Sequence, residues 1–128
     1  MTKFAKVPTL KIELEQFDEM ERTYEKLFSS DEKAAQESKR KCFDRIRKSR
    51  DQCIDEYTSL MNELRAIEQD NPEVYEMIYW HDIKGLSWES TSSKVLKDLR
   101  PYYGYDYCRS KVYKYLKRRD QNQADEEE

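Results

Sequence analysis

Glycine and proline are scarce in this chain, which has two Gly and three Pro among 128 residues. Tight turns depend on these residue types, and a β-protein of this size needs many such turns. Charged residues make up 40% of the sequence and apolar residues 37%, against about 25% and about 45–50% in typical globular domains. So little apolar material cannot enclose one large core. We therefore expect an all-α protein built from long, partly solvated helices.

The first part of the chain carries a helical seam of apolar residues. From Thr9 onward they recur at offsets of four and three, with Glu21 at the one missing position: Leu10, Leu14, Phe17, Tyr24 and Phe28. This spacing is the seven-residue repeat of a helix that packs along another helix. Ser29 and Glu32 have the form of a capping box, so a second helix is expected to begin near Ser30. Residues 1–7 are expected to be a flexible start.

The second helix is expected to be the longest element, with one apolar stripe interrupted only at Arg50. The stripe consists of Phe43, Ile46, Cys53, Tyr57, Leu60, Leu64 and Ile67. Roughly forty residues extend on the order of 60 Å, and such a helix cannot bury its stripe alone. The first helix can fold back on it as an antiparallel hairpin, or a second copy of the chain can cover it. We favour a homodimer with contacts at Cys53, Tyr57, Leu60, Leu64 and Ile67, and assign residues 1–70 to dimerisation or partner binding.

Residues 39–50 are strongly basic. A basic helix that leads into a heptad zipper is how leucine-zipper proteins grip the major groove. Phe43 and Ile46, however, continue the apolar seam inside the basic stretch, and only about two clean heptads remain before Pro72. We favour a solvated basic face that is balanced by the acidic residues 51–76. Auxiliary contact with phosphates and docking on an acidic protein remain as alternatives.

Residues 71–119 are expected to form three helices. Asn71 can cap the first, with Pro72 at its first position, and Gly85 can end it after Lys84. Ser87 can cap the second helix, which Pro101 and Gly104 then break. The apolar residues of these two helices are Val74, Met77 and Ile78, followed by Trp88, Val95 and Leu99.

The third of these helices is basic and amphipathic. Asp106 can cap it, and Cys108, Val112 and Leu116 fall on one side. The residues that point away or lie at the edges, and so form the candidate DNA-binding set, are Arg109, Ser110, Lys111, Tyr113, Lys114, Lys117 and Arg118. Of these, Ser110, Lys111 and Lys114 are placed for the major groove, and the last two for phosphates. A short capped helix, a turn and a basic amphipathic helix together predict a helix-turn-helix unit that binds DNA, with a merely solvated basic helix as the alternative.

Two motifs in this region resemble those of a known family. The run Asp82-Ile-Lys-Gly-Leu-Ser-Trp-Glu89 is similar to the entry of the last helix-turn-helix of bacterial sigma factors, and residues 104–118 resemble its recognition helix. Thr91 and Ser92 stand where that family has small or aliphatic residues, and Arg-Pro-Tyr-Tyr-Gly lengthens the turn. A long charged helical segment ahead of such a unit is similar to RinA/ArpU-type activators of phage late genes. The resemblance implies a sequence-specific regulator of transcription on double-stranded DNA, in the cytoplasm of a bacterial host, with RNA polymerase as a further possible partner.

Two other functions compete with this interpretation. A subunit that recognises DNA for phage packaging also joins a helix-turn-helix to oligomerising helices. An interaction protein that inhibits a host factor would use the tyrosine-rich surface against protein instead of DNA. An enzyme is the weakest class, because no catalytic constellation can be assembled, and no cofactor or metal is expected from Cys42, Cys53 and Cys108 with the single His81. No apolar run approaches the ~20 residues of a membrane span, so no membrane is expected.

Three smaller features have competing interpretations. His81 is expected to be a packing histidine and not an acid–base group. The tyrosines near the third helix can stack on nucleic acid or fill the small core, with Tyr107 and Tyr113 expected on the exposed side and Tyr115 inside. Residues 120–128 are expected to be a disordered acidic tail that provides solubility or competes with DNA for the basic helix.

Overall fold

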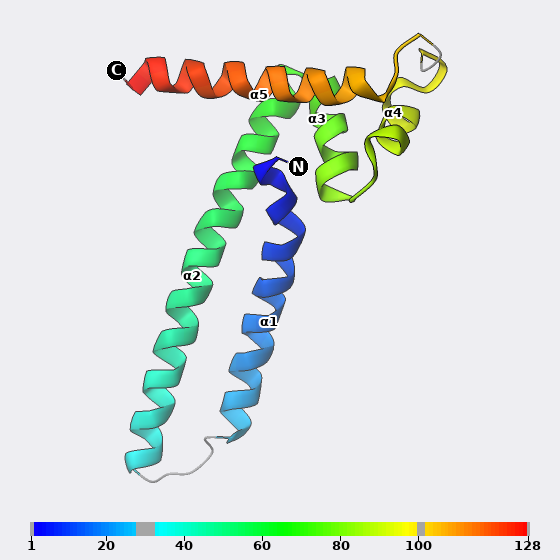
Figure 1. Ribbon diagram of the computed structural model, residues 1–128. Helices are drawn as coiled ribbons and strands as arrows, with labels where there is room; N and C mark the ends of the chain where they lie inside the picture. The colour runs from blue at the N-terminus through cyan, green and yellow to red at the C-terminus, as the bar shows by residue number, and fades with distance from the viewer. Residues whose placement is uncertain (1, 28–32, 100–101, 128) are drawn as a thin grey trace. The chain divides into compact units, whose positions relative to one another are not determined.

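The computed structural model describes residues 2–27, 33–99 and 102–127, and every regular element in these ranges is helical (Figure 1). This confirms the expected all-α class. The elements in order are η1 (Lys3–Ala5), α1 (Lys6–Leu27), α2 (Lys33–Asp70), α3 (Pro72–Ile78), η2 (Tyr79–Ile83), α4 (Trp88–Leu96), η3 (Lys97–Leu99) and α5 (Tyr105–Glu127). Of these, η1 and η3 are 3₁₀ turns and η2 is a π-helical turn. The expected capping box at Ser29–Glu32, like Phe28 and Pro101, lies outside the described residues.

The chain divides into two compact units. The hairpin unit is Lys6–Met61, and the C-terminal unit combines Met1–Ala5 with Asn62–Glu128. The division therefore falls within α2, whereas the sequence suggested a boundary at residue 70. The N-terminal residues do not form a flexible start. Phe4 is fully buried, and the amide and hydroxyl of Thr2 both donate to Asp82 in the C-terminal unit.

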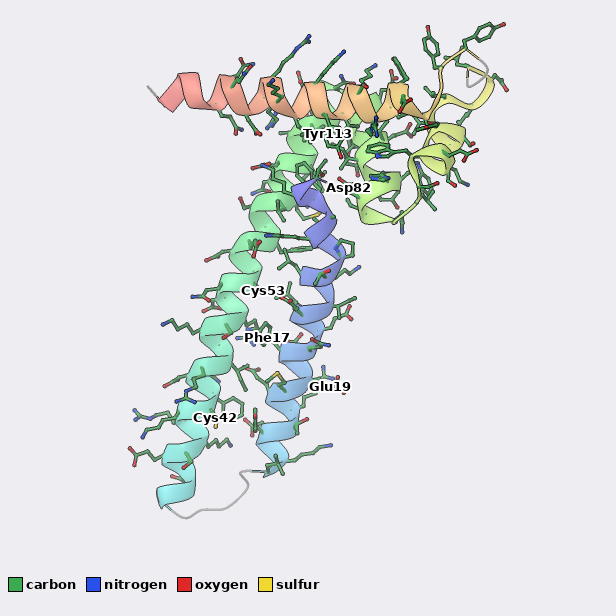
Figure 2. The ribbon with its side chains drawn as sticks, viewed as in Figure 1. Phe17, Glu19, Cys42, Cys53, Asp82 and Tyr113 are labelled. Atoms are coloured by element: carbon green, nitrogen blue, oxygen red, sulfur yellow. The ribbon has the colours of Figure 1, made fainter. Side chains whose placement is uncertain are left out.

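In the hairpin unit, α1 and α2 are antiparallel and lie side by side (Figure 1). The ion pairs between them join early residues of one helix to late residues of the other, as in Lys6–Glu56 at 3.6 Å and Lys39–Glu25 at 3.1 Å. The buried apolar residues of this unit are Val7, Leu10, Phe43, Ile46, Cys53 and Leu60. The sulfur of Cys53, labelled in Figure 2, lies 3.6 Å from the carbonyl oxygen of Leu10. The hairpin alternative is thus the one that the structure adopts.

Glu21 and Arg50 are the two charged residues that interrupt the seams of α1 and α2, and they meet. Arg50 Nη1 lies 3.2 Å from Glu21 Oε1, and both side chains are about three-quarters buried, with 26% and 25% exposed. Arg47 Nε lies 3.6 Å from the same oxygen. A charge at a seam position costs stability, but it specifies which partner and which register are correct. The pairing of Arg50 with Glu21 therefore favours α1 as the partner of α2, in the register that brings these two residues together.

The predicted dimer seam is buried within a single chain. Cys53, Leu60, Leu64 and Ile67 are between 0% and 8% exposed, and Tyr57 is half-buried. The periodicity correctly identified which face of α2 is covered, but a periodicity does not reveal whose surface covers it. Cys53, Leu60, Leu64 and Ile67 are therefore core residues of the folded chain and do not form a free dimerisation surface.

The expected balance of the basic residues 39–50 is also corrected. In the described part of the chain, Lys39, Arg47 and Arg50 pair with Asp18, Glu21 and Glu25 of α1 and not with the acidic residues 51–76. The physical reason is distance, because antiparallel packing brings the carboxylates of α1 directly opposite these cations.

In the C-terminal unit, α3, α4 and α5 pack on one another. The buried side chains described in this unit are Phe4, Leu64, Ile67, Val74, Met77, Ile78, His81, Asp82, Thr91, Ser92, Leu96, Cys108 and Val112. Two helix caps are confirmed. Asn71 Oδ1 accepts from the amide of Val74 at 3.2 Å, and Ser87 Oγ accepts from the amide of Ser90 at 3.1 Å.

The end of the first short helix differs in one respect from the expectation. The α-helical pattern stops at Ile78, and a π turn over Tyr79–Ile83 precedes Lys84. The extra residue in this turn brings His81 onto Trp88, with 3.7 Å between ring centroids, and the carbonyl oxygen of Leu86 accepts from His81 Nδ1 at 2.7 Å. His81 is therefore a buried packing residue on Trp88 of α4, as expected.

The buried face of α4 was predicted incorrectly. Leu99 lies in η3 and is 55% exposed, whereas Thr91 and Ser92 are fully buried. Ser92 Oγ donates to the carbonyl oxygen of Trp88 at 2.8 Å, so its hydroxyl is satisfied by its own helix. A hydroxyl that is satisfied in this way can enter a core, and small side chains allow α4 to approach α5 closely.

Both ends of α5 also differ from the prediction. Asp106 does not cap the helix, because α5 already begins at Tyr105 and the carbonyl oxygen of Gly104 accepts from the amide of Tyr107 at 3.1 Å. Asp106 instead pairs with Arg109 one turn later, at 3.3 Å. At the other end, α5 continues to Glu127 through the segment expected to be a disordered tail. The sequence has no glycine or proline after Gly104, so no residue there breaks the helix.

Gly85 ends the π turn with φ at +75°, a conformation that costs other residues about 1–2 kcal/mol. We expect Gly85→Ala to destabilise the C-terminal unit by about that amount. Gly104→Ala is the matched control, because neither glycine has an atom within 4 Å of an added Cβ and only Gly85 has a positive φ. Both tryptophans, Trp80 and Trp88, belong to the C-terminal unit, so tryptophan fluorescence during urea unfolding reports its stability. Equal midpoints for the two variants would contradict the role of Gly85.

Candidate nucleic-acid interface

The orientation of α5 is set by two side chains on its inner face. Cys108 and Val112 are fully buried against α3 and α4, and Leu116 is half-buried one turn later. At about 100° per residue, the residues opposite them are Ser110, Lys114 and Lys117. Burial raises the pKa of the Cys108 thiol, and the contact with Ser92 Oγ at 3.4 Å only partly offsets this effect. The thiol is therefore a neutral core group.

The outward face of α5 is basic and open. Ser110, Lys114, Lys117 and Arg118 are exposed, and none of these four forms an ion pair with another described residue. Arg109 lies at the edge, where it is 52% exposed and paired with Asp106. Exposed cations without internal partners can neutralise external anions at no cost in broken ion pairs.

Lys111 is the exception in the predicted set. Its Nζ lies 3.0 Å from Glu73 Oε2 on α3 and 3.2 Å from the hydroxyl of Tyr107, and its side chain is 30% exposed. Burial opposes the charge of this ammonium, but the hydrogen bonds to Glu73 and Tyr107 prevail and raise the pKa of Lys111. Lys111 therefore fastens α5 to α3, and its expected position in the groove is corrected.

The aromatic residues around α5 separate into two groups. Tyr113 is 42% exposed and meets the edge of Trp88 at a centroid distance of 6.3 Å (labelled in Figure 2), which agrees with its expected place at the edge. Tyr107 is half-buried between Lys111 and Tyr103 and is less exposed than expected. Tyr102 and Tyr103 in the turn before α5, and Tyr105 at the start of α5, are exposed, and Tyr102 is the most exposed of them at 82%.

Tyr115 joins the far part of α5 to the end of α2. Its hydroxyl donates to Asp70 Oδ2 at 2.6 Å, and burial, followed by this carboxylate, raises the pKa of Tyr115. A hollow of about 520 Å³ lies beside this contact, lined by Asp70, Tyr115, Arg118, Arg119, Asn122 and Gln123. The sequence predicted that Tyr115 lies in the core. It is instead half-buried, and its hydroxyl forms a hydrogen bond to Asp70, 45 positions earlier in the chain.

The described residues were also searched for a metal site and for a membrane-spanning helix. Within residues 2–27, 33–99 and 102–127, no three His, Cys, Asp or Glu side chains are grouped so that they could hold a metal ion. Among the helices described, none combines the length and the apolarity needed to cross a bilayer. The outward face of α5 is the strongest candidate site.

The chain was also compared with known proteins. No protein-family model, no curated protein and no solved structure matches it.

Proposed function

We propose that the C-terminal unit binds duplex DNA through α5, and that the protein is a sequence-specific transcriptional regulator of the sigma-like helix-turn-helix kind. The observation that carries this proposal is the outward face of α5, where Lys114, Lys117 and Arg118 are exposed and form no ion pair with any described residue, while Lys111 is held on α3. A helix that is locked on one side by packing and basic on the other is suited to the major groove. The sigma-like assignment rests on the motifs at residues 82–89 and 104–118, and the link to phage late genes rests on the long charged helical segment that precedes them.

The proposed roles along α5 follow from position. Ser110 and Lys114 are the outward residues of its first half, and helix-turn-helix proteins contact base edges with that half of the recognition helix. Lys117 and Arg118 come one turn later, where contact with the phosphate backbone is more natural. Tyr113, packed on Trp88, can pack against a sugar or a thymine methyl at the edge of the groove.

One observation favours a second candidate function. Leu99, Tyr102, Tyr103 and Tyr105 are all exposed around the turn that precedes α5. Exposed apolar and aromatic side chains that gather in one place often mark a protein-binding surface. An interaction protein that inhibits a host factor would use this turn, and it would not bind DNA even at low salt.

The two candidates are separated by selecting bound fragments from a random pool of duplex DNA and then comparing variants on the selected site. We expect Ser110→Ala or Lys114→Ala to weaken binding to the selected site by about 1–3 kcal/mol, with little effect on random DNA. Lys117→Ala is the matched control, because a lost phosphate contact weakens binding to both DNAs about equally. A pool that yields no enriched sequence, with no binding at low salt, would favour the interaction protein.

A further inference from the structure

Apart from the exposed Arg40, the basic residues of α2 between positions 39 and 50 fall into two sets. The first set faces α1. Lys39 pairs with Glu25, Arg47 with Glu21, and Arg50 with Glu21 and Asp18, at distances of 3.1 to 3.9 Å. The charges of this set are therefore matched inside the hairpin unit.

The second set faces solvent, and we call it the hairpin row: Lys41, Arg45 and Lys48. These residues are spaced by four and three, so they share one face of α2, opposite the buried Phe43 and Ile46. All three are exposed, and none forms an ion pair with any residue in the described part of the chain. Asp44, one turn from both lysines, is exposed as well and pairs with neither. The row is therefore a strip of unmatched positive charge.

We propose that the hairpin row binds the phosphate backbone of duplex DNA, as a second contact in addition to α5. This inference rests on the proposed function. The row spans about 10 Å along the helix, and duplex DNA carries one negative charge per about 1.7 Å of its axis. A duplex therefore offers each of the three cations at least one phosphate within reach. We assign the row to phosphates, because lysine and arginine side chains contact the DNA backbone at any sequence and such contacts carry no sequence information.

The occupant is assigned from charge complementarity. A duplex offers a regular array of anions to a regular row of cations, whereas the nearest acidic surface of the protein itself, on α1, already pairs with the other set. The binding contribution is independent of sequence, since phosphates are the same at every site. It therefore appears in the salt dependence of affinity and not in discrimination between sites.

The test uses the full chain and a duplex of about 40 base pairs, which at about 3.4 Å per pair is more than twice the length of α2. The row variant is Lys41→Ala with Arg45→Ala and Lys48→Ala. We expect the slope of log K against log salt to fall by roughly two to three units, with unchanged preference for the selected site. The matched control is Lys11→Ala with Arg22→Ala and Lys26→Ala, which removes the same three charges from exposed positions on α1 of the same unit.

Each outcome decides the question. A lower slope for the row variant and a parental slope for the control support the proposal. Equal slopes for the row variant and the parent overturn it, and so do equal losses in the row variant and the control, which would reduce the effect to net charge. If Lys117→Ala lowers the slope while the row variant does not, the proposed phosphate contact of the hairpin row is wrong and the proposed role of α5 stands. The row would then be a candidate surface for binding an acidic protein. If the parent does not bind duplex DNA, the proposed function and the row fail together.

Discussion

Replacing Ile78 with alanine is expected to destabilise the C-terminal unit by about 2–5 kcal/mol, because the large-to-small change leaves a cavity in a packed core. Ile78 is fully buried on α3, as are Val74 and Met77 of the same helix, and α3 packs on both α4 and α5. Total stabilities of single domains are about 5–15 kcal/mol, so this one change removes a large share. Leu99→Ala is the control, since Leu99 is 55% exposed and its loss should change stability by less than about 0.5 kcal/mol.

The two buried cysteines allow the two units to be followed separately. Cys108 lies in the C-terminal unit and Cys53 in the hairpin unit, and burial raises the pKa of both thiols. Alkylation of either thiol therefore requires local opening. We expect Ile78→Ala to accelerate alkylation of Cys108 by at least about tenfold, since 1.4 kcal/mol corresponds to a factor of ten, and to leave Cys53 unchanged. Unchanged labelling of Cys108 would mean that Ile78 is not part of a core shared by the three helices.

Much of the fold could be predicted because its signals are local. The scarcity of glycine and proline predicted the helical class, and the caps at Asn71 and Ser87 follow from side chains that reach only a few residues along the chain. The stripe on α2 was correct for the same reason, since a periodicity describes one helix. The periodicity could not tell which surface covers the stripe. The charged residues Glu21 and Arg50, which interrupt the two apolar seams and form an ion pair, indicated that α1 covers it.

The errors arose where a side chain depends on a distant partner. Thr91 and Ser92 were discounted because a search for apolar periodicity omits hydroxyls, although positions 91 and 92 follow Trp88 by three and four and so share its face of the helix. Lys111 stands at the flank of α5, where Glu73, thirty-eight positions earlier, decides its direction. The continuation of α5 to Glu127 depends on the absence of helix breakers, which an acidic composition obscured.

The central claim is that the outward face of α5, and not its charge as a whole, binds DNA. It is tested most directly by the salt dependence of duplex binding for Lys117→Ala with Arg118→Ala, compared with Lys111→Ala in the same helix. Both outward residues are exposed, whereas Lys111 is held by Glu73 at 3.0 Å. Protection of Cys108 from alkylation verifies that each variant keeps its core.

We expect the double variant to lower the slope of log K against log salt by about two units, since each lost phosphate contact contributes about 0.9. Lys111→Ala, which loses a contact inside the protein, should leave the slope at the parental value and reduce only the stability of the C-terminal unit. A parental slope in the double variant, or an equal fall in Lys111→Ala, would contradict the proposed interface.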